Sequence, residues 1–345
     1  MKEKIGFLAI GQAGGNIGKL LQEKGYTVLF INTSQEDLNT LDNAKFKHHI
    51  TGGEGCNRDR HKAKQLVIDD YDNIAQEIDN KIKTDIIFCI FSTGGGTGSG
   101  AGPMLMDLLI DDGKKVGAIT VIPSINEPIK RQINFYECFM ELNGIENSSG
   151  VFAIDNDKGD KMQLNPIFVD AFTALLEIPD KHKSERGNID KAEIKEALFS
   201  HGTSIITTTR EKDTSALIKT FTENIFAPME ADRVIKYITL SSVDDISNID
   251  LEKSVGITVD TFQTYNDDMT ICMLSGLSFP KTRLDAALQK IEANKEIIVK
   301  NLAATNESSM KGNVNFLSEI CKNPSAPADQ KHKTKRDITN KYLRS

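Results

Sequence analysis

The chain has 345 residues, 39% of them hydrophobic, and a formal net charge of −7. Single hydrophobic cores rarely grow beyond roughly 250 residues, so this length predicts two packed domains. There is no run of about 18 apolar residues and no signal-peptide pattern after Met1, which predicts a cytoplasmic protein without a membrane partner. The five cysteines form no C-x-x-C pair and the six histidines no H-E-x-x-H pattern, so we interpret the cysteines as structural and expect no metal site built from side chains.

The negative charge is concentrated in the body of the chain, because the last residues are basic. This segment has two acidic residues, Asp329 and Asp337, and six basic ones, Lys331, Lys333, Lys335, Arg336, Lys341 and Arg344. An acidic body repels nucleic acid. We therefore expect no direct sequence-specific DNA binding, and expect any contact with DNA to run through the tail or through another protein.

The first half of the chain alternates short apolar runs with amphipathic stretches, which predicts a parallel sheet covered on both faces by helices. The predicted strands span residues 4–10, 27–32, 85–91, 115–122 and 150–155. The predicted helices span residues 58–81, 103–111 and 129–142. These elements predict a doubly wound, mostly parallel α/β domain, in which ligands bind at the carboxyl ends of the strands.

The pattern changes after residue 160. It predicts a long helix over 162–177, a polar stretch, a helix over 191–200, strands at 203–209, 234–241, 257–264 and 270–275, and a long helix over 283–302. We expect the four strands to form a smaller mixed sheet in a second α+β domain. The predicted division is 1–160 (Rossmann-like domain), 161–201 (central helix and a loop), 202–281 (second domain), 282–311 (C-terminal helix) and 312–345 (flexible basic tail).

The most informative string is Gly94-Gly95-Gly96-Thr97-Gly98-Ser99-Gly100, which lies between a predicted buried strand and an apolar helix. Glycines allow the backbone to approach phosphate closely, and consecutive amide groups at a helix N-terminus form an anion site supported by the helix dipole. Thr97 and Ser99 add hydroxyl donors. A flexible glycine linker does not connect two core elements, so the string predicts a phosphate-binding loop.

A second glycine-rich string, Gly11-Gln12-Ala13-Gly14-Gly15-Asn16-Ile17-Gly18, follows the first predicted strand. Ala13 and Asn16 stand where the dinucleotide fingerprint G-x-G-x-x-G needs glycine, and the Lys-Ser/Thr ending of a P-loop is missing. Together with 94–100, the string resembles the phosphate loops of the tubulin/FtsZ superfamily. The resemblance covers residues 1 to about 200, and it implies GTP or GDP as the ligand of domain 1–160, with Mg²⁺ held mainly through phosphates and water.

Two further loops are similar to segments of that family. Gly52-Gly53-Glu54-Gly55-Cys56-Asn57 resembles the loop that senses the terminal phosphate, and Gly53 and Gly55 are included in the predicted site. The 123–131 segment has the spacing of the ribose loop, which implies that Glu127 accepts hydrogen bonds from sugar hydroxyls and that Arg131 lies beside the nucleotide. Without the resemblance, Glu127 and Arg131 fit an exposed charge pair at a helix start equally well.

The string Asp155-Asn156-Asp157-Lys158, after the last strand of the first sheet, resembles the base-recognition segment. An asparagine side chain offers a donor and an acceptor, so Asn156 can read the edge of guanine and leave adenine unsatisfied. Asn165 of the central helix is the second predicted base contact, and its alternative is an N-cap ahead of Pro166. Asn32, at the end of the 27–32 strand, completes the predicted nucleotide site.

The string Gly187-Asn188-Ile189-Asp190-Lys191-Ala192-Glu193 resembles the loop that one family subunit inserts into the nucleotide site of its neighbour. Three residues apart at a helix start, Asp190 and Glu193 face the same side and would orient a water against the terminal phosphate, with Asn188 beside them. A capping box is the alternative, and both roles are compatible. The resemblance therefore implies GTP hydrolysis that requires assembly into a head-to-tail filament of identical subunits.

The long last helix and basic tail look like the TubZ branch of the family, which segregates plasmid or prophage DNA and binds a DNA-binding adaptor protein through its C-terminal region. The alternatives are a phage tubulin that positions DNA, a divergent cell-division FtsZ and a GTP-binding scaffold without turnover. A nicotinamide-dependent dehydrogenase is the alternative from a different class. The misfit of the first glycine string argues against the dehydrogenase, and Asp190 and Glu193 argue against the scaffold.

Overall fold

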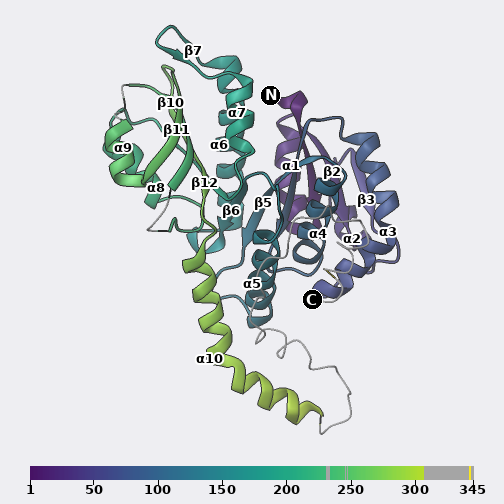
Figure 1. Cartoon of the computed structure of the whole chain (residues 1–345). Helices are drawn as coiled ribbons and strands as arrows, with labels where there is room; N and C mark the ends of the chain where they lie inside the picture. The colour runs from purple at the N-terminus through teal and green to yellow at the C-terminus, as the bar shows by residue number, and fades with distance from the viewer. Residues whose placement is uncertain (231–233, 245, 247, 307–341, 343–345) are drawn as a thin grey trace.

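The computed structural model describes residues 1–230, 234–244, 246, 248–306 and 342, and these residues are built around one ten-stranded mixed sheet (Figure 1). In spatial order its strands are β11 (Ile257–Tyr265), β10 (Val234–Ser242), β12 (Thr270–Leu277), β9 (Thr203–Thr209), β6 (Val151–Asp155), β5 (Lys115–Ile122), β4 (Ile86–Ser92), β1 (Ile5–Ile10), β2 (Thr27–Asn32) and β3 (Phe46–His49). From β3 to β9 every neighbouring pair is parallel.

Helices cover both faces of this parallel part, which confirms the predicted doubly wound α/β class. One core cluster contains side chains of α1 (Gly11–Glu23) and α6 (Lys161–Lys181). The cluster on the other face contains side chains of α3 (Arg60–Lys81), α4 (Thr97–Asp111) and α5 (Ile129–Asn143). All six residues of β1 are buried, as a strand covered on both faces requires.

The central helix α6 is held against the sheet by aromatic packing. The ring of Phe172 contacts those of Phe7, Phe88 and Phe152 at centroid distances of 6.1, 5.6 and 5.5 Å. Phe168 stacks beside it at 5.5 Å. Because these rings come from β1, β4, β6 and α6, the helix has one fixed position along the strands.

The second half of the chain differs from the expected separate sheet, because β9 continues the first sheet through β6. The connection is short: only Val151 pairs with Thr203 and Phe152 with Ser204. Beyond them the edge of β6 is taken by the segment 225–227, since Asp155 N donates to Ile225 O and Ala227 N donates to Ala153 O, both at 2.9 Å. The remaining strands of this half pair antiparallel, except β10 with β11.

Several elements differ from the predicted bounds. The helix expected over 103–111 begins at Thr97, and the short strand β3 and the helices α2 (Gln35–Asn39), α8 (Thr214–Thr222) and α9 (Asn248–Val255) were not predicted. The 179–187 stretch holds the end of α6 and the small hairpin β7 (Lys183–Ser184) and β8 (Gly187–Asn188), which precedes α7 (Lys191–Leu198). The hairpin packs on β11, at the upper end of the molecule in Figure 1.

The last described helix, α10 (Lys281–Asn306), runs from the junction of the two halves along α5 and away from the sheet (Figure 1). Most of the predicted tail, 312–341 and 343–345, lies outside the described residues. Tyr342 is described, and its ring is fully buried. Its hydroxyl lies 3.2 Å from Asp107 Oδ2 of α4, and Lys64 Nζ of α3 lies 5.2 Å from its ring centroid.

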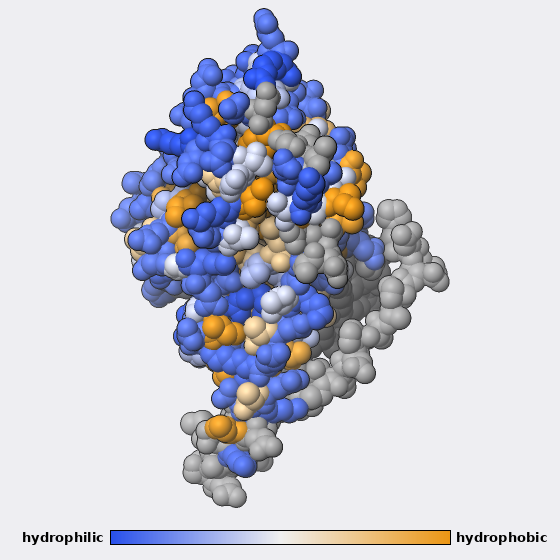
Figure 2. All heavy atoms as spheres, turned by 90° about the vertical axis from the view of Figure 1, so that its left-hand side faces the viewer, coloured by the Kyte–Doolittle hydropathy of each residue, from blue (hydrophilic) through white to orange (hydrophobic). Residues whose placement is uncertain are grey.

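Figure 2 shows the side of the molecule that carries β10 and β11, where apolar side chains lie among polar ones. Val234 and Ile257, which are register partners at this edge, are both largely exposed. In the described part of the chain, no helix is long and apolar enough to span a membrane.

Candidate nucleotide site and acidic loop

The two predicted phosphate loops meet at the carboxyl ends of β1 and β4. The helix α1 begins at Gly11, directly after β1, and α4 begins at Thr97 within the glycine string 94–100. A Cβ on Gly11, whose φ is +71°, would lie 3.3 Å from the Gly98 amide nitrogen. A Cβ on Gly14 would lie 2.2 Å from Ile90 O of β4. Glycine at both positions therefore allows the two helix starts to lie side by side.

The amide groups at these helix starts are not capped by side chains. The N-cap residues of α1, α4 and α5 make no side-chain capping bond. By contrast, α2, α3, α6, α7 and α8 each have a side chain that caps their first turn. The first amides of a helix need acceptors, and a phosphate supplies them. Among α1 to α8, the three helices whose N-cap side chain makes no capping bond are those that follow the predicted phosphate and ribose loops.

The predicted phosphate-sensing loop, residues 52–57, is connected to the glycine string 94–100 through Thr33. The Thr33 carbonyl accepts from Gly55 N at 2.8 Å, and its hydroxyl lies 2.7 Å from Thr97 Oγ1. His49 Nε2 lies 2.8 Å from the Gly53 carbonyl and therefore donates to it. Sequence reasoning missed Thr33 and His49, although their place after β2 and at the end of β3 beside the loop could have indicated them.

A buried arginine completes the first turns of α4. Pro103 lies inside this helix and has no amide proton for the Ser99 carbonyl. Arg60 of α3 replaces that donor, with Nη2 at 3.0 Å and Nε at 3.3 Å from Ser99 O. Its charge is balanced by Glu137 at 2.8 Å and Glu141 at 2.6 Å. Burial alone would lower the pKa of Arg60, but these two glutamates keep it above its ordinary value.

A buried asparagine holds the loop ahead of α4. Asn134 Nδ2 of α5 donates to the carbonyls of Gly95 at 2.8 Å, Arg58 at 3.1 Å and Gly94 at 3.3 Å. With these carbonyls engaged behind the loop, the amides that follow in the first turn of α4 are held in one orientation. Neither Arg60 nor Asn134 belongs to a recognisable string, so the sequence alone did not indicate them.

The predicted ribose loop, residues 123–128, leads into α5. Glu127 accepts from Ser124 N at 3.0 Å and forms an ion pair with Arg131 one turn later. The charge pair that the sequence left as an alternative is therefore present, at the loop where a sugar was expected. This pairing fixes the position of the Glu127 carboxylate and leaves it partly exposed.

The predicted base segment, residues 155–158, begins at the last residue of β6. Asn156 Oδ1 is buried and has no hydrogen-bond partner within the described residues. Such an orphaned acceptor fits a bound donor group. Asn165 is not the N-cap of α6, because Asp160 occupies that position and α6 continues through Pro166. The capping alternative for Asn165 is therefore wrong, and the residue lies half-buried in the second turn.

The other predicted contacts are less direct. Gln12 and Asn16 are exposed on the first turns of α1. A Cβ added to Gly15 would lie 3.4 Å from Leu41 Cδ1. Asn32 is buried, and its amide contacts Asp37 at 3.2 Å and Ser34 N at 3.2 Å. Asn32 therefore shapes the turn after β2 through both ends of its side chain.

The acidic loop, residues 187–193, forms a complete capping box. Asp190 Oδ1 accepts from Ala192 N at 2.7 Å and Glu193 N at 2.9 Å, and Glu193 Oε2 accepts from Asp190 N at 2.8 Å. Asp190 and Asn188 are exposed. The box uses one oxygen of each carboxylate, so the second oxygens remain outside it, and the predicted capping role is present.

The acidic loop is fixed at the far end of α6 from the base segment. Thr264 of β11 donates to the carbonyl of Gly187 at 2.9 Å, and the Arg186 guanidinium lies 4.0 Å from the Tyr265 ring centroid. Since α6 has 21 residues and rises 1.5 Å per residue, the two ends are about 30 Å apart. Within one chain, Asp190 therefore cannot reach a nucleotide at the glycine loops.

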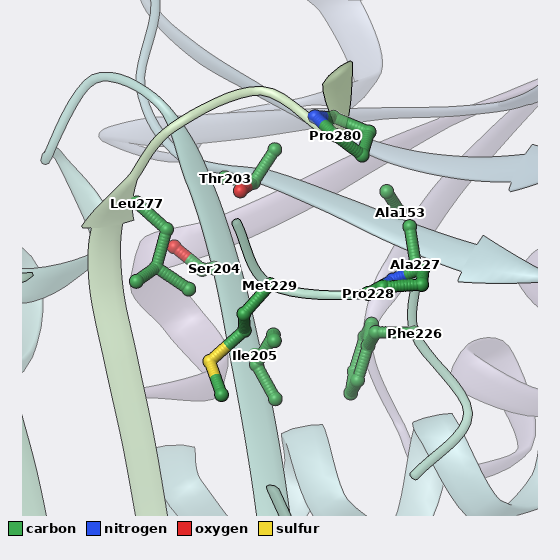
Figure 3. Close-up of a pocket in the computed structure, with 10 residues that line it drawn as sticks. All are labelled: Ala153, Thr203, Ser204, Ile205, Phe226, Ala227, Pro228, Met229, Leu277 and Pro280. Carbon is green, nitrogen blue, oxygen red and sulfur yellow. The ribbon is translucent and has the colours of Figure 1, made fainter. Parts of the chain in front are cut away.

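A small hollow lies at the junction of β6 and β9, where the two strands separate (Figure 3). It is lined by Ala153, Thr203, Ser204, Ile205, Phe226, Ala227, Pro228, Met229, Leu277 and Pro280. None of these residues belongs to the glycine loops. Its mostly apolar walls do not suit phosphate. In the described residues, no group of three or more His, Cys, Asp and Glu side chains is arranged to hold a metal ion.

Comparisons with known proteins agree with this geometry. The pattern described as Tubulin/FtsZ family, GTPase domain, matches residues 4–162. The tubulin-like protein TubZ of Clostridium botulinum C phage is 31% identical over 303 residues, which are 85% of this chain and 84% of that protein. The crystal structure of Clostridium botulinum phage c-st TubZ has a TM-score of 0.77 at 29% identity, and the match covers 86% of this chain and 99% of that one.

A GTPγS-form protofilament of TubZ from Bacillus thuringiensis serovar israelensis matches with a TM-score of 0.72 at 16% identity, over 89% of this chain and 94% of that one, which shows the shared fold. The chain therefore belongs to the tubulin/FtsZ family and carries its GTPase domain over residues 4–162. Within the family, its similarity to the TubZ proteins runs through both halves of the chain.

The glycine string offers a test of where the phosphates lie. A Cβ on Gly95 would meet no atom within 4 Å, so Gly95→Ala should leave the melting temperature of the nucleotide-free protein unchanged. We expect it to weaken GTP binding by about ten- to a hundredfold, because the methyl group keeps the phosphates from one or two charge-assisted hydrogen bonds. Calorimetric titration with GTP measures this effect.

Two further variants serve as controls. Gly144→Ala, at the end of α5, makes ordinary contacts of 3.5 Å and should change neither melting temperature nor affinity. Gly14→Ala should lower the melting temperature itself, since its Cβ clashes with Ile90 O. Unchanged GTP affinity of Gly95→Ala would show that the phosphates do not approach this loop.

Proposed function

We propose that this protein is a GTP-hydrolysing filament protein in which each active site is shared by two subunits. One subunit supplies the glycine loops, the ribose loop and the base segment. The next supplies Asn188, Asp190 and Glu193. The observation that carries the proposal is the separation of these two sets by the length of α6, about 30 Å.

The end-to-end geometry supports head-to-tail stacking. The acidic loop lies beyond the amino ends of the strands, whereas the glycine loops follow their carboxyl ends. Stacking one subunit on another along the strand direction therefore brings Asp190 of one molecule to the phosphates held by its neighbour. The protofilament and two-stranded filament seen for the Bacillus thuringiensis relative are consistent with such an assembly.

In this proposal, hydrolysis needs the positioning of a water rather than a covalent intermediate. The carboxylates of Asp190 and Glu193 orient the water, whose oxygen attacks the terminal phosphorus while the bond to the bridging oxygen breaks, giving GDP and phosphate. The amides of α1 and α4 stabilise the charge on the phosphate oxygens. Mg²⁺, held mainly through phosphate oxygens and water, would neutralise further charge there.

The filament is proposed to move DNA during plasmid or prophage segregation. The similarity to TubZ proteins supports this role, together with the acidic body, which disfavours direct DNA binding. A DNA-binding adaptor that docks on the basic C-terminal segment would connect filament and DNA. The related roles of phage DNA positioning and cell division use the same polymerisation chemistry and differ in the partner.

Asp190→Asn tests the catalytic assignment. Asparagine caps helices as well as aspartate does, so α7 and GTP binding should be retained. Without the negative charge, the water is polarised less, and we expect GTPase activity to fall by about 10²- to 10⁴-fold and filaments to persist. Phosphate release and light scattering measure the two effects. Asp213→Asn, the matching N-cap of α8, should leave both unchanged; equal turnover of wild type and Asp190→Asn contradicts the assignment.

The shared site also predicts how turnover depends on protein concentration. Phosphate release per subunit should be close to zero at low concentration and rise above a threshold, because a single subunit lacks the acidic pair. The threshold should coincide with the onset of light scattering. A rate per subunit that is constant over the whole concentration series would show that the site is complete within one molecule.

A truncation after Pro324 tests the adaptor proposal. Assembly and GTPase activity should be retained, because the truncation removes none of the residues that form the two halves of the active site, while co-sedimentation with the DNA-bound adaptor should be lost. The melting temperature should fall, because the truncation also removes the buried ring of Tyr342. Replacing only Lys331, Lys333 and Lys335 by Gln provides a charge control on the full-length chain. If the truncated chain still co-sediments with the adaptor, the partner docks elsewhere.

A further inference from the structure

The first turn of α10 reaches the two loops that contact the sugar and the base in the proposed function. Arg283 Nε lies 3.0 Å from Asp155 Oδ2, and Nη2 lies 3.1 Å from Asp157 Oδ2 and 2.5 Å from the Pro123 carbonyl. Asp155 and Asp157 belong to the base segment, and Pro123 begins the ribose loop. One guanidinium therefore bonds to both segments.

This arginine is buried together with one of its partners. Arg283 is 6% exposed and Asp155 is 1% exposed, and the Phe135 ring of α5 lies 5.4 Å from the guanidinium carbon. Burial raises the pKa of the Asp155 carboxyl, and Arg283 opposes that rise. A buried ion pair is favourable only when its geometry is good and further hydrogen bonds satisfy both groups. The contacts to Pro123 and Asp157 supply additional bonds at Nη2, whereas the buried Nη1 has no hydrogen-bond partner within the described residues.

Asp157 links the base segment directly to the ribose loop. Its Oδ1 accepts from Ser124 Oγ at 2.6 Å and from Ile125 N at 3.0 Å. Asp157 N in turn donates to Asp155 Oδ1 at 3.0 Å. Asp157 therefore joins the two segments to each other. Arg283 contacts both of them, so their relative position depends on the Arg283 side chain.

A second cation of α10 holds the other side of the ribose loop. Lys290 Nζ donates to the carbonyl of Glu127 at 3.0 Å and also to that of Ile125. Lys290 follows Arg283 by seven residues, which is nearly two full turns, so both side chains lie on the same face of α10. The buried Ala287 and Ile291 lie on that face as well. This face of α10 therefore contacts the ribose loop and the base segment over two turns of the helix.

We propose that Arg283 and Lys290 are positioning residues for nucleotide recognition, which set the geometry of the base segment and the ribose loop and thereby the selectivity of the site. The inference rests on the proposed assignment of these loops to guanine and ribose. The two residues differ in their contacts: Lys290 holds the loop that carries Glu127, whereas Arg283 holds the segment that carries Asn156. Lys290 therefore governs discrimination at the sugar, and Arg283 contributes to discrimination at the base.

Lys290→Met in the full-length chain tests the first half of this inference. Glu127 would keep its partner Arg131, but its carbonyl would lose the Lys290 donor and keep only the longer contact to Gln132 Nε2 at 3.5 Å. We expect the preference for GTP over 2′-deoxy-GTP, measured as a ratio of dissociation constants, to fall by roughly five- to tenfold, equivalent to one hydrogen bond. The melting temperature without nucleotide should stay close to wild type, and Lys290→Arg should restore part of the preference.

Lys281→Met is the matched control, because it removes the same charge from the first turn of α10. Lys281 is largely exposed and pairs with Asp285, and it makes none of the contacts to the two loops. Its sugar preference should equal that of the wild type. A general effect of charge on α10 would change both methionine variants alike and would overturn the inference.

Arg283 needs a more conservative change, because its removal leaves Asp155 buried with a charge. Arg283→Lys keeps the charge and loses the forked geometry that reaches three oxygens. The double variant Arg283→Met with Asp155→Asn removes both charges together. Both proteins should bind GTP with a reduced preference over ATP, while the preference over 2′-deoxy-GTP changes less than in Lys290→Met.

The outcomes separate the inference from the proposed function. If the wild type binds no GTP, the proposed function fails and the inference fails with it. If the wild type binds GTP and Lys290→Met keeps the full sugar preference, the inference is overturned and the proposed function stands. Loss of stability without loss of selectivity in the Arg283 variants would show a purely structural role and would overturn the second half.

Discussion

The hydrogen bonds from the Arg60 guanidinium to the Ser99 carbonyl are the interaction on which the phosphate loop depends. Pro103 leaves that carbonyl without its helical donor, and the arginine that replaces this donor is buried with two glutamates that balance its charge. This cluster joins α3, α4 and α5. It explains how a string of seven residues with five glycines, followed by Pro103, forms an ordered helix start rather than a flexible linker.

The binding loops, in turn, form a connected set. Thr33 ties the phosphate-sensing loop to Thr97, Asn134 holds the carbonyls ahead of α4, and Arg283 joins the base segment to the ribose loop. Each of these side chains comes from a different part of the chain. Asn134 and Arg283 donate to loop carbonyls, whereas Thr33 bonds to the Thr97 hydroxyl. The amides at the starts of α1 and α4 are thereby left for the ligand. This arrangement follows the general rule that buried polar groups are satisfied.

The sequence predicted most of the sheet and both glycine loops because strand periodicity and glycine strings are local signals. The start of α4 was missed, because glycines disfavour a helix. The contact from Arg60 and the proposed phosphate-binding role, which explain this helix start, are not visible in the local sequence. The expected separate second sheet was wrong because two residue pairs, Val151 with Thr203 and Phe152 with Ser204, leave no local signal of continuity. Arg60, Asn134, Thr33 and Arg283 act over sequence separations of 39 to 128 residues, which periodicity cannot reveal.

The placement of the nucleotide loops and the acidic pair at opposite ends has an arithmetic consequence. In a row of n subunits assembled as proposed, each junction would complete one site, so the row would hold n − 1 competent centres and one bound nucleotide that has no neighbour to cleave it. The uncleaved molecule always occupies the same terminus, however long the row becomes. The two ends of any such polymer therefore differ chemically from the first dimer onward.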